Sequence, residues 1–227
     1  MEPTYWVVSA GIALIPGILY ALGFYLADIY EREPYLHVFG AFLWGAVPAL
    51  IIAALFNQSL DSVWLQDNPI LAIGLVGPFV EESLKVMAVA AIYLLARQEF
   101  DGPLDGLVYG ALVGFGFAMT ENISYFVIVA KSQGWVQWLS IVLLRVVVFG
   151  LSHATYTALG GIGLGLARHS STFGRKAVFV LSAWLLAIGL HGAHNLAGQF
   201  GGLTKFIGVG LALVNLFGIY IAFQRSY

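Results

Sequence analysis

The sequence of 227 residues contains no cysteine and few charged side chains. Without cysteine there is no disulfide framework, no thiol redox motif and no thiolate metal site. Only 10% of the residues are charged, the net charge is −2, and no basic patch is present, so nothing supports nucleic-acid binding. The first apolar run has no basic segment before it and no small-residue cleavage site after it, so we expect it to be retained as a helix.

What the sequence has in abundance is apolar residues, at 60% of the total with a mean hydropathy of +0.88. This composition predicts an all-α, polytopic membrane protein with a single membrane-embedded domain over residues 1–227 and no soluble domain. About 20 apolar residues in a helix cross the roughly 30 Å hydrocarbon layer, and we expect about seven such transmembrane helices. They are Tyr5–Leu26, Tyr35–Phe56, Pro69–Ala96, Leu104–Ala130, Gln137–Ala167, Lys176–Gln199 and Leu203–Phe223.

The basic residues outside the apolar runs predict the orientation. Loops on the cytoplasmic side of a membrane carry an excess of Lys and Arg. Alternating passes place Arg32, Arg97, Arg168, Arg175, Lys176 and Arg225 on one side, and Lys131 and Lys205 on the other. We therefore expect a multi-pass protein of the cell membrane with an extracytoplasmic N-terminus and a cytoplasmic C-terminus.

Glycines recur every four residues in the fourth apolar run, and a shorter repeat lies in the fifth. Small residues at this spacing allow two helices to approach closely, so we expect these glycines to serve packing. They are Gly102, Gly106, Gly110 and Gly114, followed by Gly161 and Gly165.

The third apolar run contains two adjacent carboxylates, Glu81 and Glu82, and the ammonium of Lys85. Ionisable groups at this depth cost roughly 2.5–3.5 kcal/mol each on insertion scales and usually serve a function. Adjacent carboxylates in low dielectric must take a proton, find a cation or bind a metal. Lys85 follows them by four and three residues, so one helical turn brings it within reach of either. Pro78 removes a backbone hydrogen bond just before the pair.

Other polar side chains lie at similar depth in the next three runs. At 1.5 Å per residue, Glu81, Glu121, His153 and His191 lie about 14–24 Å from the predicted outer ends of their helices. The spacing of four from Arg145 through Phe149 to His153 predicts that these residues share one helix face. The intramembrane polar residues after the glutamate pair are Glu121, Asn122, Arg145, His153, His191, His194 and Asn195.

Imidazoles and carboxylates at one depth fit two chemistries. They suit a divalent metal such as zinc, with one coordination position open to water. Alternatively, a carboxylate and a histidine activate water directly as general base and acid. A serine nucleophile is not indicated, because Ser83 and Ser152 lie beside the polar residues in sequence and therefore point to different helix faces.

Four motifs in this order resemble those of the PrsW family of intramembrane proteases. The family is related to the CAAX prenyl endopeptidases and the bacteriocin-processing proteases. Relative to the patterns of those relatives, Lys85 stands one place before their arginine and Glu121 replaces their histidine, which favours the PrsW branch. The motifs are Glu81-Glu82-x-x-Lys85, Gly116-Phe117-Ala118-x-x-Glu121-Asn122-x-x-Tyr125, His153-Ala154-x-x-Thr157 and His191-x-x-His194-Asn195.

The resemblance implies an intramembrane endopeptidase that cuts a membrane-anchored protein in the lipid bilayer, for which an anti-sigma factor is the family's best-known substrate. It implies paired glutamates at the centre of the reaction, and it leaves both a metal-dependent and a metal-free glutamate mechanism open. The residues themselves favour zinc, because His153, His191 and Glu121 add ligands. We assign catalytic roles to Glu81, Glu82, His153, His191 and Asn195, zinc ligation to Glu82, Glu121, His153 and His191, and supporting roles to Lys85, Asn122, Arg145 and His194. Two other classes use buried charge: an ion-coupled transporter, in which the Glu and His side chains relay protons, and a scaffold, in which they only fix packing. Seven spans without an internal repeat speak against the transporter.

Overall fold

A computed structural model describes residues 2–27, 32–60 and 67–200, which are almost entirely helical and contain no strand. The all-α prediction is confirmed. Segments labelled η are π-helical, with one extra residue in the turn. In chain order the elements are α1 Glu2–Ala27, α2 Tyr35–Trp44, η1 Gly45–Ala49, α3 Leu50–Leu60, α4 Pro69–Leu71, η3 Ala72–Val76, α5 Gly77–Leu95, α6 Pro103–Gln133, α7 Trp135–Val142, η4 Leu143–Val148, α8 Ser152–Arg168 and α9 Phe173–Phe200.

Several of these helices are long and apolar enough to cross a membrane, which makes the chain a multi-pass membrane protein. The continuous helix formed by α4, η3 and α5 is of similar length but carries three ionisable residues in its middle. The expected seventh span, Leu203–Phe223, lies outside the described residues, so the count of seven stays a prediction. Among the described residues, five helical stretches are long and apolar enough, counting α7, η4 and α8 as one: Thr4–Leu26, Tyr35–Leu60, Pro103–Gln133, Trp135–Arg168 and Phe173–Gln199.

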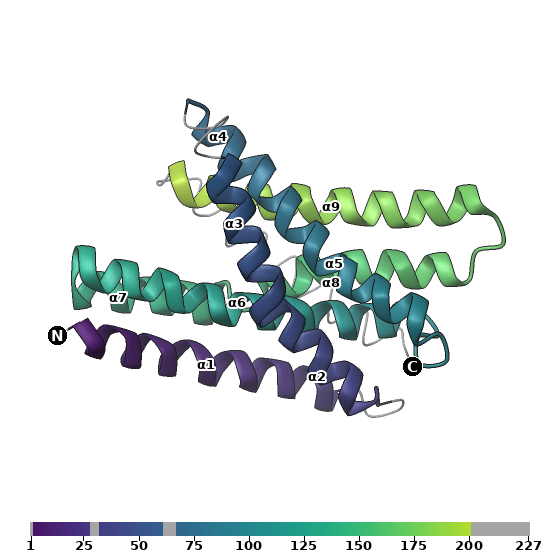
Figure 1. The fold of residues 1–227 in the computed structure, drawn as a ribbon, viewed down its shortest axis with the longest axis horizontal. Helices are drawn as coiled ribbons and strands as arrows, with labels where there is room; N and C mark the ends of the chain where they lie inside the picture. The colour runs from purple at the N-terminus through teal and green to yellow at the C-terminus, as the bar shows by residue number, and fades with distance from the viewer. Residues whose placement is uncertain (1, 28–31, 61–66, 201–227) are drawn as a thin grey trace.

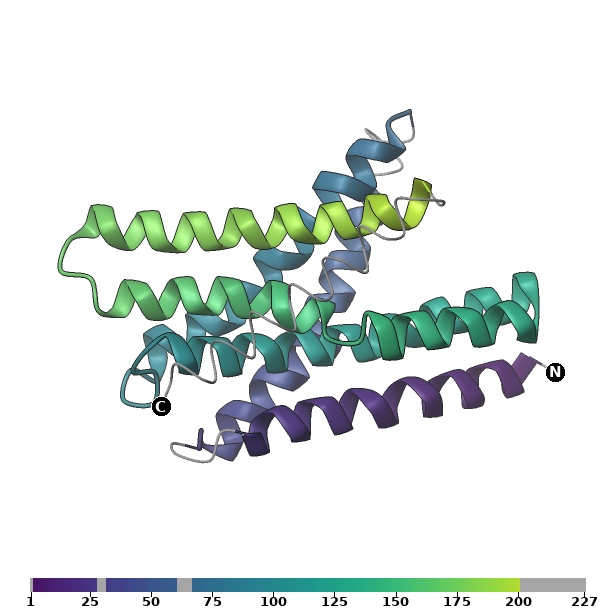
Figure 2. The same cartoon turned by 180° about the vertical axis from the view of Figure 1, so that it is seen from behind.

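The helices run back and forth between two ends of a bundle. In Figures 1 and 2, the N-terminus of α1 and the turn between α6 and α7 lie at one end, and the links from α5 to α6 and from α8 to α9 lie at the other. The guanidinium of Arg168 donates a hydrogen bond to the backbone carbonyl of Arg97 at 2.9 Å, which joins two loops of that second end. Those two basic residues therefore lie at the same end, as the alternation predicts. Which end faces the cytoplasm stays a prediction.

Helix α6 forms the centre of the bundle and packs against α8, α1 and α2. Its contact with α8 depends on glycine. A Cβ added at Gly106, Gly110 or Gly114 would overlap the α8 backbone at Gly161, Thr157 or His153, respectively. Only residues without a Cβ allow this approach, so the packing role predicted for the glycine repeat is confirmed.

The fifth apolar run is not one continuous helix. The backbone turns at residues 149–151, between η4 and the start of α8 at Ser152. The prediction that Arg145, Phe149 and His153 share one helix face was therefore wrong, because the spacing of four assumed an unbroken helix. The π-helical turns of η4 and the break after it place Arg145 on a separate segment from His153.

Candidate active site

The glutamate pair lies near the start of α5, just after η3. Pro78 lies inside the continuous helix just after the π-helical turn of η3, and its missing N–H removes one backbone hydrogen bond there. Glu81, Glu82 and Lys85 are all buried, and Glu82 and Lys85 have no exposed surface. Their face of α5 is turned toward α8 and α9, both of which α5 contacts. The polar groups therefore face protein rather than lipid.

Lys85 connects the two glutamates to α8. Its Nζ lies 2.8 Å from Glu82 Oε1, 3.5 Å from Glu81 Oε2 and 3.2 Å from His153 Nδ1. An ammonium has three donors and no acceptor, so these three contacts use it fully, and His153 must accept through Nδ1. The Nζ also lies 3.7 Å from the centre of the Phe117 ring, which adds a cation–π contact. The prediction that Lys85 reaches both glutamates is confirmed.

Glu82 is held by three elements of the bundle. Besides Lys85, it accepts a hydrogen bond from Thr157 Oγ1 at 3.0 Å, and its Oε1 lies 2.8 Å from His191 Nδ1. Because Glu82 is a carboxylate, the His191 proton lies on Nδ1 and leaves the Nε2 lone pair free. The Nε2 of His191 lies 3.8 Å from Glu81 Oε2. Glu82 thus orients His191 toward Glu81.

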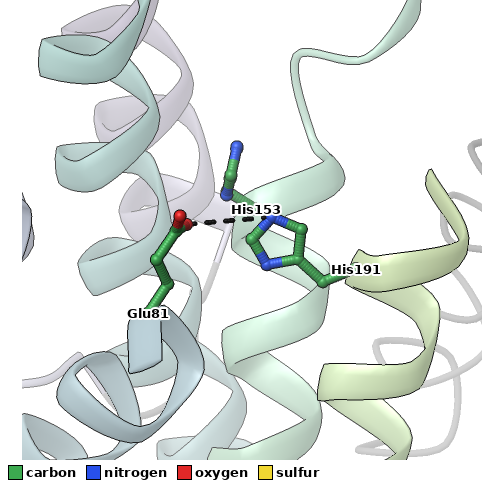
Figure 3. A group of neighbouring side chains, drawn as sticks. All are labelled: Glu81, His153 and His191. Atoms are coloured by element: carbon green, nitrogen blue, oxygen red, sulfur yellow. Dashed lines mark ion pairs between the residues drawn. The ribbon is translucent and has the colours of Figure 1, made fainter. Parts of the chain in front are cut away.

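Glu81, His153 and His191 form a group of possible metal ligands from three helices. Each offers a ligand atom within 4.8 Å of the others, and Figure 3 shows the three side chains pointing toward one another. Zinc bonds of about 2.0–2.2 Å in a tetrahedron separate ligand atoms by roughly 3.4 Å, so small side-chain rotations bring these atoms to zinc distances. Two histidines and one carboxylate are also a donor set known from catalytic zinc sites. The residues therefore fit a divalent metal.

A second cluster surrounds Arg145 and contacts the first through His153. The guanidinium pairs with Glu121, donates through Nε to Asn122 Oδ1 at 2.5 Å, and lies 4.0 Å from the centre of the Tyr125 ring. Glu121 Oε2 also lies 3.1 Å from His153 Nε2. Each of the two histidines thus has a carboxylate partner, Glu121 for His153 and Glu82 for His191. Three carboxylates and two cations leave the combined cluster with a net negative charge, which favours a bound cation.

The remaining two predicted residues, His194 and Asn195, lie at the edge of the cluster. Asn195 Nδ2 donates to the carbonyl of Ile73 in η3 at 3.3 Å, which ties α9 to the π-helical segment. The His194 ring packs edge-on against Phe149, with 4.6 Å between ring centres. Its Nδ1 is buried without a hydrogen-bond partner among the described residues.

A cavity of about 460 Å³ adjoins the cluster. Glu81, Arg145 and Asn195 line it, so the cavity reaches the catalytic candidates directly. Sequence reasoning assigned no role to Thr157 or Asn57, although Thr157 lies within the third motif. Asn57 carried no signal, since nothing in the sequence places α3 beside α5. The other lining residues are Asn57, Ala72, Ile73, Val76, Gly77, Tyr125, Ile141, His194, Gly198 and Gln199.

The fold and the site together define a polytopic membrane protein with a buried, metal-competent cluster of carboxylates and imidazoles beside a cavity. Comparison with known proteins specifies the class further. A sequence profile described as PrsW family intramembrane metalloprotease matches residues 33–223. The Protease PrsW of Bacillus subtilis is 34% identical over 190 residues, which cover 83% of this chain and 81% of that protein. The Protease PrsW of Geobacillus kaustophilus is 32% identical over 189 residues, or 83% of this chain and 77% of that protein. No solved structure matches the chain.

The chain belongs to the PrsW family of intramembrane metalloproteases. It is therefore a membrane-embedded peptidase, and its substrate is a protein. The predicted membership of this family is confirmed, and the transporter alternative is not favoured.

Proposed function

We propose that the protein hydrolyses a peptide bond of a membrane-anchored protein, with zinc held by Glu81, His153 and His191. The observation that carries this proposal is the convergence of these three side chains from α5, α8 and α9, one of which, Glu81, also lines the cavity. A membrane-anchored anti-sigma factor is the substrate that the family resemblance suggests.

The zinc set proposed here differs from the one expected from sequence alone. Glu82 and Glu121 are replaced by Glu81, because each of the two already holds a histidine by a hydrogen bond. Carboxylates behind metal-binding histidines fix the ring orientation and raise the basicity of the ligand. We therefore assign Glu82 and Glu121 to positioning His191 and His153.

The chemistry required is the activation of water and the stabilisation of charge on the scissile carbonyl. A divalent ion held by Glu81, His153 and His191 would supply both, by activating water and polarising the carbonyl. Without a metal, Glu81 is the group placed to take a proton from water, because it is the glutamate that lines the cavity. Arg145 lines the same cavity and is the cation available to the developing oxyanion.

The contact between Lys85 and His153 competes with metal binding at His153. Both ring nitrogens of His153 already have partners, Lys85 at Nδ1 and Glu121 at Nε2. A metal that binds His153 must displace one of them. The ammonium also contacts Glu81, so it lies among the groups that we assign to the metal.

The test is cleavage of a synthetic single-span peptide by the purified protein in detergent, with zinc measured by elemental analysis. Wild type should cleave the peptide, and Glu81→Gln should lose several orders of magnitude in rate together with its zinc. Ser83→Ala is the matched control, because Ser83 lies on the same helix and its Oγ is bound to the Phe79 carbonyl. Cleavage by Glu81→Gln at the wild-type rate would remove this residue from the mechanism.

A further inference from the structure

One of the polar side chains that line the cavity, Asn57, has no assigned role in the proposed reaction. Asn57 on α3 lines the cavity, and its Oδ1 is buried without a hydrogen-bond partner among residues 2–27, 32–60 and 67–200. A buried acceptor that lacks a donor carries a desolvation penalty, so native proteins seldom leave one unpaired. The amide is therefore available to a donor that enters the cavity.

The position of Asn57 relative to the glutamates can be worked out along α5. A Cβ added at Gly77 would lie 3.8 Å from Asn57 Nδ2, so the amide lies beside Gly77. Gly77 precedes Glu81 by four residues, which is about 6 Å along the helix axis. An extended chain advances about 3.3 Å per residue, so Asn57 is about two residues of extended chain from Glu81.

An extended polypeptide is the occupant whose hydrogen-bonding groups match the amide of Asn57. A helix satisfies its own backbone groups, whereas an extended segment presents free N–H and C=O groups that need partners where water is scarce. An amide side chain offers both a donor and an acceptor to such a backbone. The cavity volume of about 460 Å³ lies within the usual range of ligand sites, about 300–1,000 Å³.

We propose that Asn57 is a substrate-binding residue, whose Oδ1 accepts a backbone N–H of an extended substrate segment about two residues from the scissile bond. This inference rests on the proposed peptidase function and adds the form in which the substrate is bound. Because the amide of Asn57 pairs with a backbone group, it would recognise the substrate backbone and not a particular side chain.

An ester scan tests the proposal. The probe is the synthetic single-span peptide, in which each amide near the cleavage site is replaced in turn by an ester that lacks the N–H. With wild type, one ester about two residues from the scissile bond should lower kcat/KM by about threefold to tenfold, the value of one neutral hydrogen bond. Esters at the other positions that contact no acceptor should not show this loss.

Variants then assign that loss to Asn57. Asn57→Ala should lower kcat/KM for the all-amide peptide by the same factor, mainly through KM, and should lose nothing further with the sensitive ester. The matched control is Ser59→Ala on the same helix, since Ser59 is exposed and its Oγ is bound to the Leu55 carbonyl at 2.8 Å. Equal losses by Asn57→Ala on the amide and ester peptides would overturn the proposal, because the residue would then act through the fold.

A binding measurement separates this proposal from the proposed function. The fluorescently labelled peptide is titrated against Glu81→Gln, with and without Asn57→Ala. Weaker binding of the double variant supports the Asn57 site even if wild type cleaves nothing, and in that case only the peptidase mechanism fails. Unchanged binding, or an ester scan of wild type with no sensitive position, overturns the Asn57 site while cleavage itself stands.

Discussion

Replacing Lys85 by methionine removes the only cation in direct contact with the Glu81 and Glu82 carboxylates among the described residues. Methionine keeps most of the volume, so the change removes charge rather than packing. Breaking a buried ion pair by deleting one partner typically costs about 3–5 kcal/mol, because the other charge is left uncompensated. For a chain of this length, each kcal/mol shifts the melting temperature by about 2–4 °C. We expect Lys85→Met to melt about 6–20 °C below wild type.

The same substitution should strengthen zinc binding. In wild type the ammonium contacts Glu81 and His153, both of which we assign to the metal. Without it, Glu81 and the Nδ1 of His153 lose this competing partner, and the site loses one positive charge. A ligand that binds only the folded state at 100 times its Kd adds about 2.7 kcal/mol. Excess zinc should therefore raise the melting temperature of Lys85→Met by more than it raises that of wild type.

The assay is a thermal melt in detergent, with a chelator or with excess zinc, for wild type, Lys85→Met and Lys131→Met. Lys131 is exposed at the end of α6 and controls for loss of a lysine. An unchanged melting profile with lost cleavage would assign Lys85 to the chemistry and refute its structural role. A zinc response no greater than that of wild type would refute the competition between the ammonium and the metal.

Three further predictions concern the glutamates, their support and the orientation. Glu82→Gln should retain more cleavage than Glu81→Gln, because the loss of an orienting group typically lowers the rate by about 10–100-fold. Equal losses in rate assays of the two purified variants would contradict the division of roles. Thr157→Val keeps the shape of the side chain but removes the 3.0 Å hydrogen bond to Glu82. Thermal melts should therefore show that the free energy of unfolding falls by about 0.5–3 kcal/mol. Full stability of this variant would mean that the bond is dispensable. A reporter fused after Tyr227 should behave as cytoplasmic, and periplasmic activity of the fusion would reverse the predicted orientation.

Local spacing was sufficient to predict part of the site. Residues three and four apart on a helix are neighbours whatever the helix packs against, so the contacts of Lys85 with Glu82 and Glu81 followed from the sequence. The glycine repeat of α6 was equally informative, since a face without Cβ atoms has few uses other than close packing.

Other features depend on the neighbours of a helix and were not predictable. Which of Glu81 and Glu82 lines the cavity is decided by how α5 is rotated against α8 and α9, and periodicity in an apolar run does not fix that rotation. The π-helical turns of η3 and η4 change which side chains share a face, and the backbone break at residues 149–151 contains no proline to signal it. The position of Asn57 beside Gly77 depends on the packing of α3 against α5.

The backbone contact between α6 and α8 fixes the position of His153 separately from the shape of the cavity. His153 lies where the α8 backbone meets Gly114, so its location relative to Glu121 does not depend on the volume of intervening side chains. The cavity, in contrast, is bounded largely by side chains of α3, η3, α7 and α9. Cavity residues can therefore be exchanged during divergence or engineering without displacing His153. We expect substrate preference in this architecture to change independently of the geometry that cleaves the bond.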